Sequence, residues 1–205
     1  MSWIEELAFI PALAVAFTGG LLILLDNRRM ILVTLAWQYL LVAWLVGVSL
    51  PIQIAAAKLV AGLMACSIMA LTLMKVGWPA QSLFPHSIPS GRVFRAIALL
   101  LALLAAGGLG QSNWISLPGL STAGVYGSTI LLAIGLLHIG LNEEPVRVGA
   151  GLLTIMAGFE VIYSAIEPSL AVMALLAAVH LGIAFVVSYL LANVTDKAVE
   201  PQAIE

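Results

Sequence analysis

Long apolar segments, separated by short polar or proline-containing stretches, follow one another along this chain of 205 residues. A helix that crosses a bilayer needs about 20 predominantly apolar residues. In lipid such a segment must be helical, because unpaired backbone N–H and C=O groups find no water to bind. We therefore predict an all-α, polytopic membrane protein with about seven transmembrane helices, over residues 7–25, 30–49, 52–74, 94–110, 123–141, 148–166 and 169–193.

The composition agrees with a chain whose solvent is lipid. Apolar residues make up 62% of the chain, charged residues only 9%, and the mean hydropathy is +1.13. Soluble domains carry about 25% charged residues, so a soluble globule is excluded. The net charge of −2 gives no case for nucleic acid as a partner. The single cysteine, Cys66, excludes a disulfide framework and is expected to be a packing residue.

The basic residues predict the orientation of the spans. With seven spans, the Lys and Arg residues outside them all fall on one side of the membrane: Arg28, Arg29, Lys75, Arg92, Arg95, Arg147 and Lys197. The opposite side carries only the acidic Glu5, Glu6 and Glu167. The positive-inside rule then places the N-terminus outside and the C-terminus in the cytoplasm. The two early glutamates also argue against a cleaved signal peptide, so the first span is expected to be retained.

Three stretches are predicted to lie outside the spans. Residues 75–93 are rich in proline and glycine and read as a cytoplasmic loop, and residues 111–122 read as a short outer loop. The chain from Val194 onward is polar and acidic, so we expect a disordered cytoplasmic tail.

Five polar or ionisable residues lie inside the predicted spans: Gln38, Lys58, His138, Glu160 and His180. A charge at the bilayer centre costs about 2.5–3.5 kcal/mol on insertion scales, so each needs a reason. Counted from the cytoplasmic ends, Glu160 and His180 lie about 18 and 20 Å deep and can face one another. The alternatives are structural. The charged residues could form a buried ion pair, Gln38 could bond between helices, and His138, one turn from a helix end, could snorkel.

The spacing of these residues predicts an internal repeat. Gln38 precedes Lys58 by 20 residues, and Glu160 precedes His180 by the same number (58 − 38 = 180 − 160 = 20). The two copies would be spans one to three and spans five to seven. Because a single span separates them, equivalent helices cross the membrane in the same direction and the copies are parallel. We therefore predict two parallel three-helix repeats joined by one helix. The proposed divisions are residues 1–74, a linking region 75–122, residues 123–193 and a tail 194–205.

The stretch DNRRMILVTLAWQYLL followed by IQIAAAKLVAGLMA resembles the K subunit of NADH-quinone oxidoreductase and the C subunit of Mrp-type cation/proton antiporters. That three-span family has an Arg-Arg-Asn-like turn, a Glu about ten residues into its second span, and AAAE followed by Gly in its third. Arg28 and Arg29 match the turn, Gln38 falls at the first Glu, and Lys58 replaces the second.

The second copy carries Glu160 and His180 at those two positions, although its turn, NEEPVR, departs from the pattern. A duplicated chain of this length looks like component E of hydrogenase-four and formate hydrogenlyase-type complexes. The resemblance covers two blocks that together make up more than half of the chain.

The resemblance implies a non-catalytic subunit of a proton- or sodium-translocating oxidoreductase, hydrogenase or antiporter-type complex in a prokaryotic cell membrane. Its implied partners are large antiporter-like membrane subunits and a redox module. Glu160 would be the main proton carrier, Lys58 its charge-coupled partner, His180 a shuttle and Gln38 a group that holds water. We include His138 in this candidate path.

Two other functions stay open. The chain could be a stand-alone seven-helix transporter that uses the same polar residues. It could also be a haem-bearing membrane anchor, although His138 and His180 differ in depth by about 15 Å, which is unfavourable for two ligands of one haem. No phosphate loop, HExxH or Ser-His-Asp pattern is present in the sequence. We therefore expect no catalytic chemistry, cofactor or metal of this chain's own.

Overall fold

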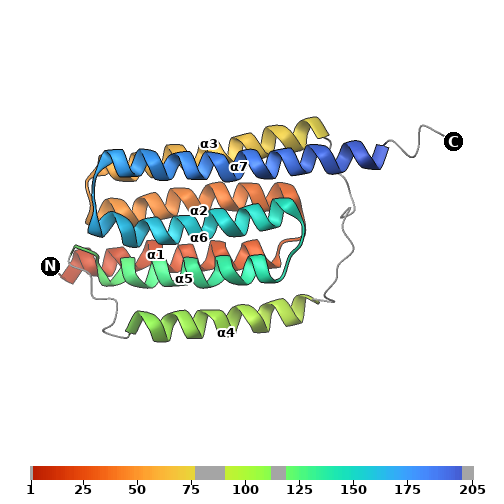
Figure 1. Ribbon diagram of the computed structural model, residues 1–205. Helices are drawn as coiled ribbons and strands as arrows, with labels where there is room; N and C mark the ends of the chain where they lie inside the picture. Colours follow the sequence, from red (N-terminus) through yellow and green to blue (C-terminus); the bar gives the residue numbers. More distant parts are fainter. Residues whose placement is uncertain (1, 77–90, 112–118, 200–205) are drawn as a thin grey trace.

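The computed structural model describes residues 2–76, 91–111 and 119–199, with side chains described between residues 9 and 193 of these ranges (Figure 1). Within them every regular element is an α-helix, as predicted. The helices are α1 (Ser2–Leu24), α2 (Arg28–Ser49), α3 (Ile52–Val76), α4 (Arg92–Gln111), α5 (Thr122–Gly140), α6 (Pro145–Ile166) and α7 (Leu170–Val199). Most of the predicted 75–93 and 111–122 loops lie outside the described residues.

Six of the seven helices are long and apolar enough to cross a bilayer, which confirms a polytopic membrane protein. Among the described side chains, α2 to α6 and residues 170–193 of α7 each meet that requirement, and α1 contributes a shorter apolar segment, Phe9–Leu24. Short turns separate them. The α2 helix begins where the Asn27 side chain accepts a hydrogen bond from the Arg29 N–H (2.9 Å), and α6 begins with Pro145 in its first turn.

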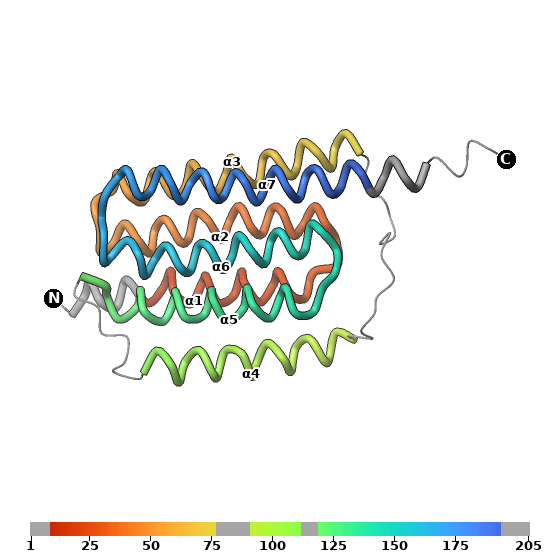
Figure 2. The backbone as a smooth tube through the Cα atoms, viewed as in Figure 1, coloured from red at the N-terminus to blue at the C-terminus, as the bar shows by residue number. Residues whose placement is uncertain are grey.

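The helices form two stacked layers with one helix at their edge (Figure 1). One layer is α1, α2 and α3, and the other is α5, α6 and α7. Across the layers α1 packs on α5, α2 on α6 and α3 on α7, while α4 packs against α5 and α1. In Figure 2, α1, α3, α5 and α7 run in one direction and α2, α4 and α6 in the other. The two three-helix units are therefore parallel, as predicted.

The residue-by-residue alignment of the two units differs from the one that the 20-residue spacings suggested. The starts of α2 and α6 are 117 residues apart (145 − 28), and those of α3 and α7 are 118 apart (170 − 52). Gln38 and Glu160 are 122 apart (160 − 38), as are Lys58 and His180 (180 − 58). The polar residues of the second unit thus lie more than one helical turn further from their helix starts than those of the first.

The expectation of a disordered tail from Val194 is wrong for its first six residues. Helix α7 continues to Val199 instead of ending near residue 193. The segment between them contains neither Gly nor Pro, and the first helix-breaking residue is Pro201. Because a proline disfavours helical backbone at the residue before it, the helix ends there and not where the polarity rises.

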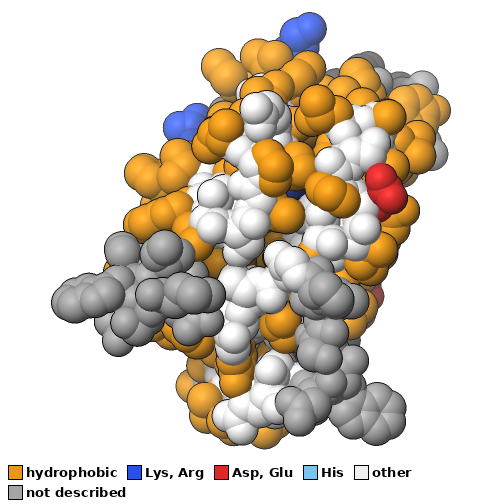
Figure 3. Space-filling view, turned by 90° about the vertical axis from the view of Figure 1, so that its left-hand side faces the viewer, with side chains coloured by type: hydrophobic (Ala, Val, Ile, Leu, Met, Phe, Trp, Pro, Cys, Tyr) orange, Lys and Arg blue, Asp and Glu red, His pale blue; other side chains and the backbone are white. Residues whose placement is uncertain are grey.

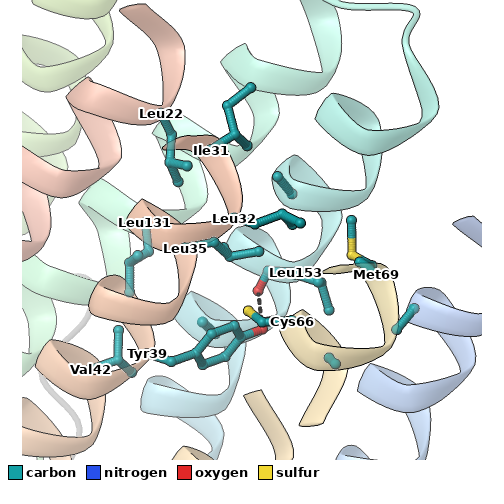
Figure 4. Close-up of a cluster of buried hydrophobic side chains, with 14 of the residues drawn as sticks. Leu22, Ile31, Leu32, Leu35, Tyr39, Val42, Cys66, Met69, Leu131 and Leu153 are labelled. Carbon is teal, nitrogen blue, oxygen red and sulfur yellow. Dashed lines mark hydrogen bonds between the residues drawn. The ribbon is translucent and has the colours of Figure 1, made fainter. Parts of the chain in front are cut away.

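The interface between the layers is an apolar core (Figure 4). Its fully buried side chains come from six helices and include Leu22, Ile31, Leu35, Met69, Leu131 and Leu153. Helices α5 and α6 approach so closely that a Cβ on Gly135 would lie 2.9 Å from the Gly151 carbonyl oxygen. Small residues commonly allow such contact between membrane helices. Cys66 is buried beside Tyr39 and packs in this core, as expected (Figure 4).

The two ends of the bundle differ in charge. The end that holds the α1–α2 and α5–α6 turns, hereafter the basic end, carries every described Lys or Arg side chain except Lys58. The opposite end holds the α2–α3 and α6–α7 turns. Figure 3 views the molecule from that opposite end, where hydrophobic side chains form most of the visible rim and few charges are seen. The predicted gathering of basic residues on one side is therefore present in the fold.

Candidate functional site

Glu160, Lys58 and His180 meet inside the bundle, and we refer to them as the buried triad. Glu160 lies on α6 between Lys58 of α3 and His180 of α7. Its Oε2 lies 3.1 Å from Lys58 Nζ, and its Oε1 lies 3.2 Å from His180 Nδ1. The three residues are 3%, 4% and 1% exposed, so the charges are removed from both lipid and water. The expected pairing of Glu160 with His180 is present, and Lys58 joins it.

The triad lies nearer to the opposite end than to the basic end. Lys58 is six residues from the start of α3, and Glu160 is six residues from the end of α6 (58 − 52 = 166 − 160 = 6). At 1.5 Å per residue both lie about 9 Å from the helix ends. This shared depth allows Lys58 and Glu160, which lie on different helices, to form an ion pair.

The hydrogen bonds of His180 fix the position of its proton. Its Nδ1 lies 3.0 Å from the backbone oxygen of Leu176, which can only accept a hydrogen bond. The Nδ1 atom therefore carries the proton and points at two acceptors, the Leu176 carbonyl and the Glu160 carboxylate. The Nε2 atom is buried and has no hydrogen-bond partner among the described residues. In the neutral imidazole with its proton on Nδ1, Nε2 is the nitrogen that offers a lone pair.

The sequence analysis missed Tyr39, which completes the site. This residue is 2% exposed, and its hydroxyl donates to the backbone oxygen of Leu153 (3.2 Å), as Figure 4 shows. Its ring lies edge-on to the His180 imidazole, with the ring centroids 5.7 Å apart. A signal was present in the sequence. Tyrosines in membrane helices favour the interfaces, whereas Tyr39 is in the middle of its span and next to Gln38.

Gly62 makes room for the Tyr39 ring. It lies one turn after Lys58 on α3, and a Cβ at this position would come within 2.1 Å of Tyr39 Cδ1. Because the ring is enclosed and hydrogen-bonded, moving it aside would cost packing contacts or the bond to Leu153. The glycine that follows the AAAK motif therefore has a packing reason that the sequence alone does not reveal.

Replacing Gly62 by alanine is expected to destabilise the protein by about 1–3 kcal/mol, the usual cost of overpacking a core. Gly182 on α7 provides a matched control, because nothing lies within 4 Å of a Cβ added there. Gly182→Ala should be neutral or stabilising by up to about 1 kcal/mol, since alanine is the better helix former. Thermal unfolding in detergent micelles compares the two variants. Equal midpoints would contradict the predicted clash.

Gln38 does not contact the triad. Its Nε2 donates to the Thr154 hydroxyl at 3.4 Å, and its Oε1 is buried without a partner among the described residues. Thr154 precedes Glu160 by six residues on α6, which corresponds to about 9 Å along the helix toward the basic end. Gln38 and Thr154 thus form a second, smaller polar pair on that side of the triad.

His138 is buried, which contradicts a snorkelling side chain. It is 2% exposed, and neither ring nitrogen has a hydrogen-bond partner among the described residues. It lies two residues before the end of α5, about 3 Å from the basic end, whereas Glu160 lies about 22 Å from the start of α6. The structure therefore does not bring His138 to the triad, although we expected it in the same path.

A second group of buried charges joins the two units at the basic end, and we call it the arginine cluster. The Arg147 guanidinium bonds Glu144 in its own turn (3.1 Å) and crosses to the backbone oxygens of Leu25 (3.1 Å) and Asp26 (2.9 Å). In return, Arg28 pairs with Glu144. Arg147 thus satisfies carbonyl groups in the turn between α1 and α2.

Asp26 extends this cluster to α4. It accepts a hydrogen bond from Arg95 (2.8 Å) and pairs with the more exposed Arg92 (3.3 Å). Partial burial alone would raise the pKa of the Asp26 carboxyl, but the hydrogen bond and charge of Arg95, with Arg92 and Arg147, hold that pKa below its usual 3.8. The contribution of Asp26 is therefore fully present above pH 3.8 and is lost only as the pH falls through the lowered pKa.

The fold and the triad define the class of protein: a polytopic α-helical membrane protein with an ionisable site enclosed in its interior. Comparison with known proteins adds no family, because no protein-family model, curated protein or solved structure matches the chain. Among the described residues, no group of three or more His, Cys, Asp and Glu is placed to hold a metal ion. Function must therefore be argued from the site.

Proposed function

We propose that this chain is a non-catalytic membrane subunit of a proton-translocating complex, in which the buried triad forms part of the proton path. The observation that carries the proposal is the Glu160 carboxylate held between Lys58 Nζ (3.1 Å) and His180 Nδ1 (3.2 Å) inside a bundle of apolar helices. Intramembrane ionisable groups are rare, and they commonly mark ion or proton routes.

The chemistry of the triad favours protons over sodium. Hard cations are bound by sets of oxygen atoms, but both Glu160 oxygens face nitrogen groups of Lys58 and His180. Each member of the triad can bind or release a proton. His180 keeps Nε2 as a free base, so a proton can enter there while Nδ1–H passes to Glu160. Lys58, 3.1 Å from Oε2, offers a positive charge to the Glu160 carboxylate.

The resemblance to the K and C subunits of oxidoreductase and antiporter complexes suggests how the chain is used. On that proposal its partners are large antiporter-like subunits and a redox module in a prokaryotic cell membrane. One observation favours the alternative of a stand-alone transporter. The triad is enclosed by helices of this chain alone, with α3, α6 and α7 supplying its members.

Isolation of the tagged chain from native membranes in mild detergent, followed by mass spectrometry, distinguishes the two. Co-purification of antiporter-like subunits together with an iron–sulfur or hydrogenase-type module would support the proposal. A chain that runs alone or as a homo-oligomer would favour the transporter, and the triad would then be tested as its transport site.

Removing the carrier tests the role of Glu160 directly. Glu160→Gln in the intact complex should abolish proton translocation while the redox module keeps its electron transfer to artificial acceptors. This change leaves Lys58 without its acidic partner. The double variant Lys58→Met/Glu160→Gln avoids the unpaired lysine, so it is expected to be more stable and is measured beside the single variant. It removes both charges together and should also fail to translocate. Translocation at the wild-type rate in either variant would overturn the assignment.

The proposed orientation places the basic end in the cytoplasm, in agreement with the positive-inside rule. In a Cys66→Ser background, a cysteine at Lys75 is expected to react with a membrane-impermeant maleimide only after the cells are opened. A cysteine at Glu167, exposed in the turn between α6 and α7, is expected to react in intact cells. The reverse pattern would place the basic end outside.

A further inference from the structure

Tyr39 contacts the buried triad and also bonds a backbone group next to the Gln38–Thr154 pair. Its ring contacts the His180 imidazole, with centroids 5.7 Å apart, and its hydroxyl bonds Leu153, the neighbour of Thr154. Tyr39 itself follows Gln38 in α2. The phenol ring therefore touches the triad on one side and borders the smaller polar pair on the other.

The Tyr39 ring is held in this position by three helices besides its own. The hydroxyl is anchored on α6, the ring edge meets His180 of α7, and the ring lies against Gly62 of α3, where even a methyl group would collide with it. At 2% exposure it fills its space. A large apolar ring fixed in this way excludes water from the volume that it occupies.

Two residues next to Tyr39 each carry a buried polar atom without a hydrogen-bond partner among the described residues. One is Nε2 of His180, whose imidazole Tyr39 contacts, and the other is Oε1 of Gln38, its neighbour in α2. Buried polar groups of this kind are usually satisfied by a partner or by water. Both atoms can bind water, and Tyr39 contacts the ring that carries one of them and is the chain neighbour of the residue that carries the other.

We propose that Tyr39 is the gate of the proton path: its ring separates the triad from the Gln38–Thr154 pair on the side of the basic end. This inference rests on the proposed function of the triad. The phenol hydroxyl serves only to anchor the ring on Leu153. Protons pass when the ring moves away from His180 and water connects Nε2 with Gln38.

The gate is tested with the full-length protein in phosphatidylethanolamine–phosphatidylglycerol vesicles that contain a pH-sensitive dye. A potassium gradient with valinomycin drives proton entry. Wild type and Tyr39→Phe should be equally tight, because both retain the ring. Tyr39→Ala should conduct protons at least about tenfold faster, which corresponds to a barrier lowered by about 1.4 kcal/mol. Adding Glu160→Gln to Tyr39→Ala should return the rate to that of wild type.

The outcomes separate the gate from the proposed function. If folded Tyr39→Ala is as tight as wild type, the gate is wrong, even where Glu160→Gln stops translocation in the complex. If Tyr39→Phe conducts protons as fast as Tyr39→Ala, the hydroxyl and not the ring closes the path, and the gate is equally overturned. If Tyr39→Ala leaks but Glu160→Gln does not reduce the leak, the proposed role of Glu160 fails instead.

Should Tyr39→Ala not fold, Tyr39→Leu decides the question. Leucine keeps apolar volume in the core but is shorter than the ring. We therefore expect this variant to conduct protons faster than wild type. The thermal midpoint of each variant is measured in the same detergent, so that loss of structure is not mistaken for an open gate. A folded, tight Tyr39→Leu protein overturns the proposal.

Discussion

Glu160→Gln is expected to lower the free energy of unfolding by about 3–5 kcal/mol, the usual cost of removing one partner from a buried ion pair. The loss arises because Lys58 and His180 both face Glu160 and are both buried, so two basic groups lose the same acceptor. Titration of the micelle-bound protein with sodium dodecyl sulfate, followed by far-UV circular dichroism, measures the change.

The partners of Glu160 provide the control for this expectation. Lys58→Met should cost less than Glu160→Gln, because His180 remains in contact with the carboxylate. The double variant Lys58→Met/Glu160→Gln should be more stable than Glu160→Gln alone, since no unpaired lysine remains. Single losses that simply add up in the double variant would show that the two charges do not interact.

Arg147→Gln is expected to have an effect of similar size, again about 3–5 kcal/mol, through loss of a buried charge that several groups share. Arg147 is 5% exposed and connects Glu144 with the backbone oxygens of Leu25 and Asp26, so it ties the two three-helix units together. Its loss leaves two carbonyl groups in the turn between α1 and α2 without their donor. The same detergent titration checks the result.

Arg92→Gln is the matched control for the arginine cluster. The Arg92 side chain is 81% exposed and contacts only the Oδ2 of Asp26 at 3.3 Å among the contacts described here. Exposed ion pairs contribute little, so this substitution should change the stability by no more than about 0.5 kcal/mol. Comparable losses in both variants would mean that burial does not determine the strength of the cluster.

The candidate site shows which inferences a single sequence supports. The apolar runs revealed Glu160, Lys58 and His180, because a charge inside a span is visible without any structure. The pairing of Glu160 with His180 also followed from depth counting. The ion pair between Lys58 and Glu160 did not follow from that count, which was made from the cytoplasmic ends, whereas the two residues share their depth when counted from the opposite ends of α3 and α6. The sequence already placed His138 one turn from a helix end, and the structure buries it there, at the basic end, away from the triad.

Tyr39, Gly62 and Arg147 illustrate what sequence reasoning missed. An aromatic residue and a glycine in an apolar helix look like ordinary packing, and their contact joins α2 with α3 in a way that no local pattern records. In the sequence, Arg147 served only as one of the basic residues that predict the cytoplasmic side of the membrane. Its role depends on carbonyl oxygens that lie more than 100 positions earlier in the chain.

By itself, the sequence determined the membrane-spanning helices, their number, the shared side of the basic residues and the parallel arrangement of the two units. These properties follow from hydrophobic length and charge, which act locally and must be satisfied by each segment in lipid. Only the tertiary structure decided which buried polar groups meet, because the facing of helices depends on their ends, their close approach at small residues and the packing of whole layers. That is why the charges could be found in the sequence, but the contacts among them could not.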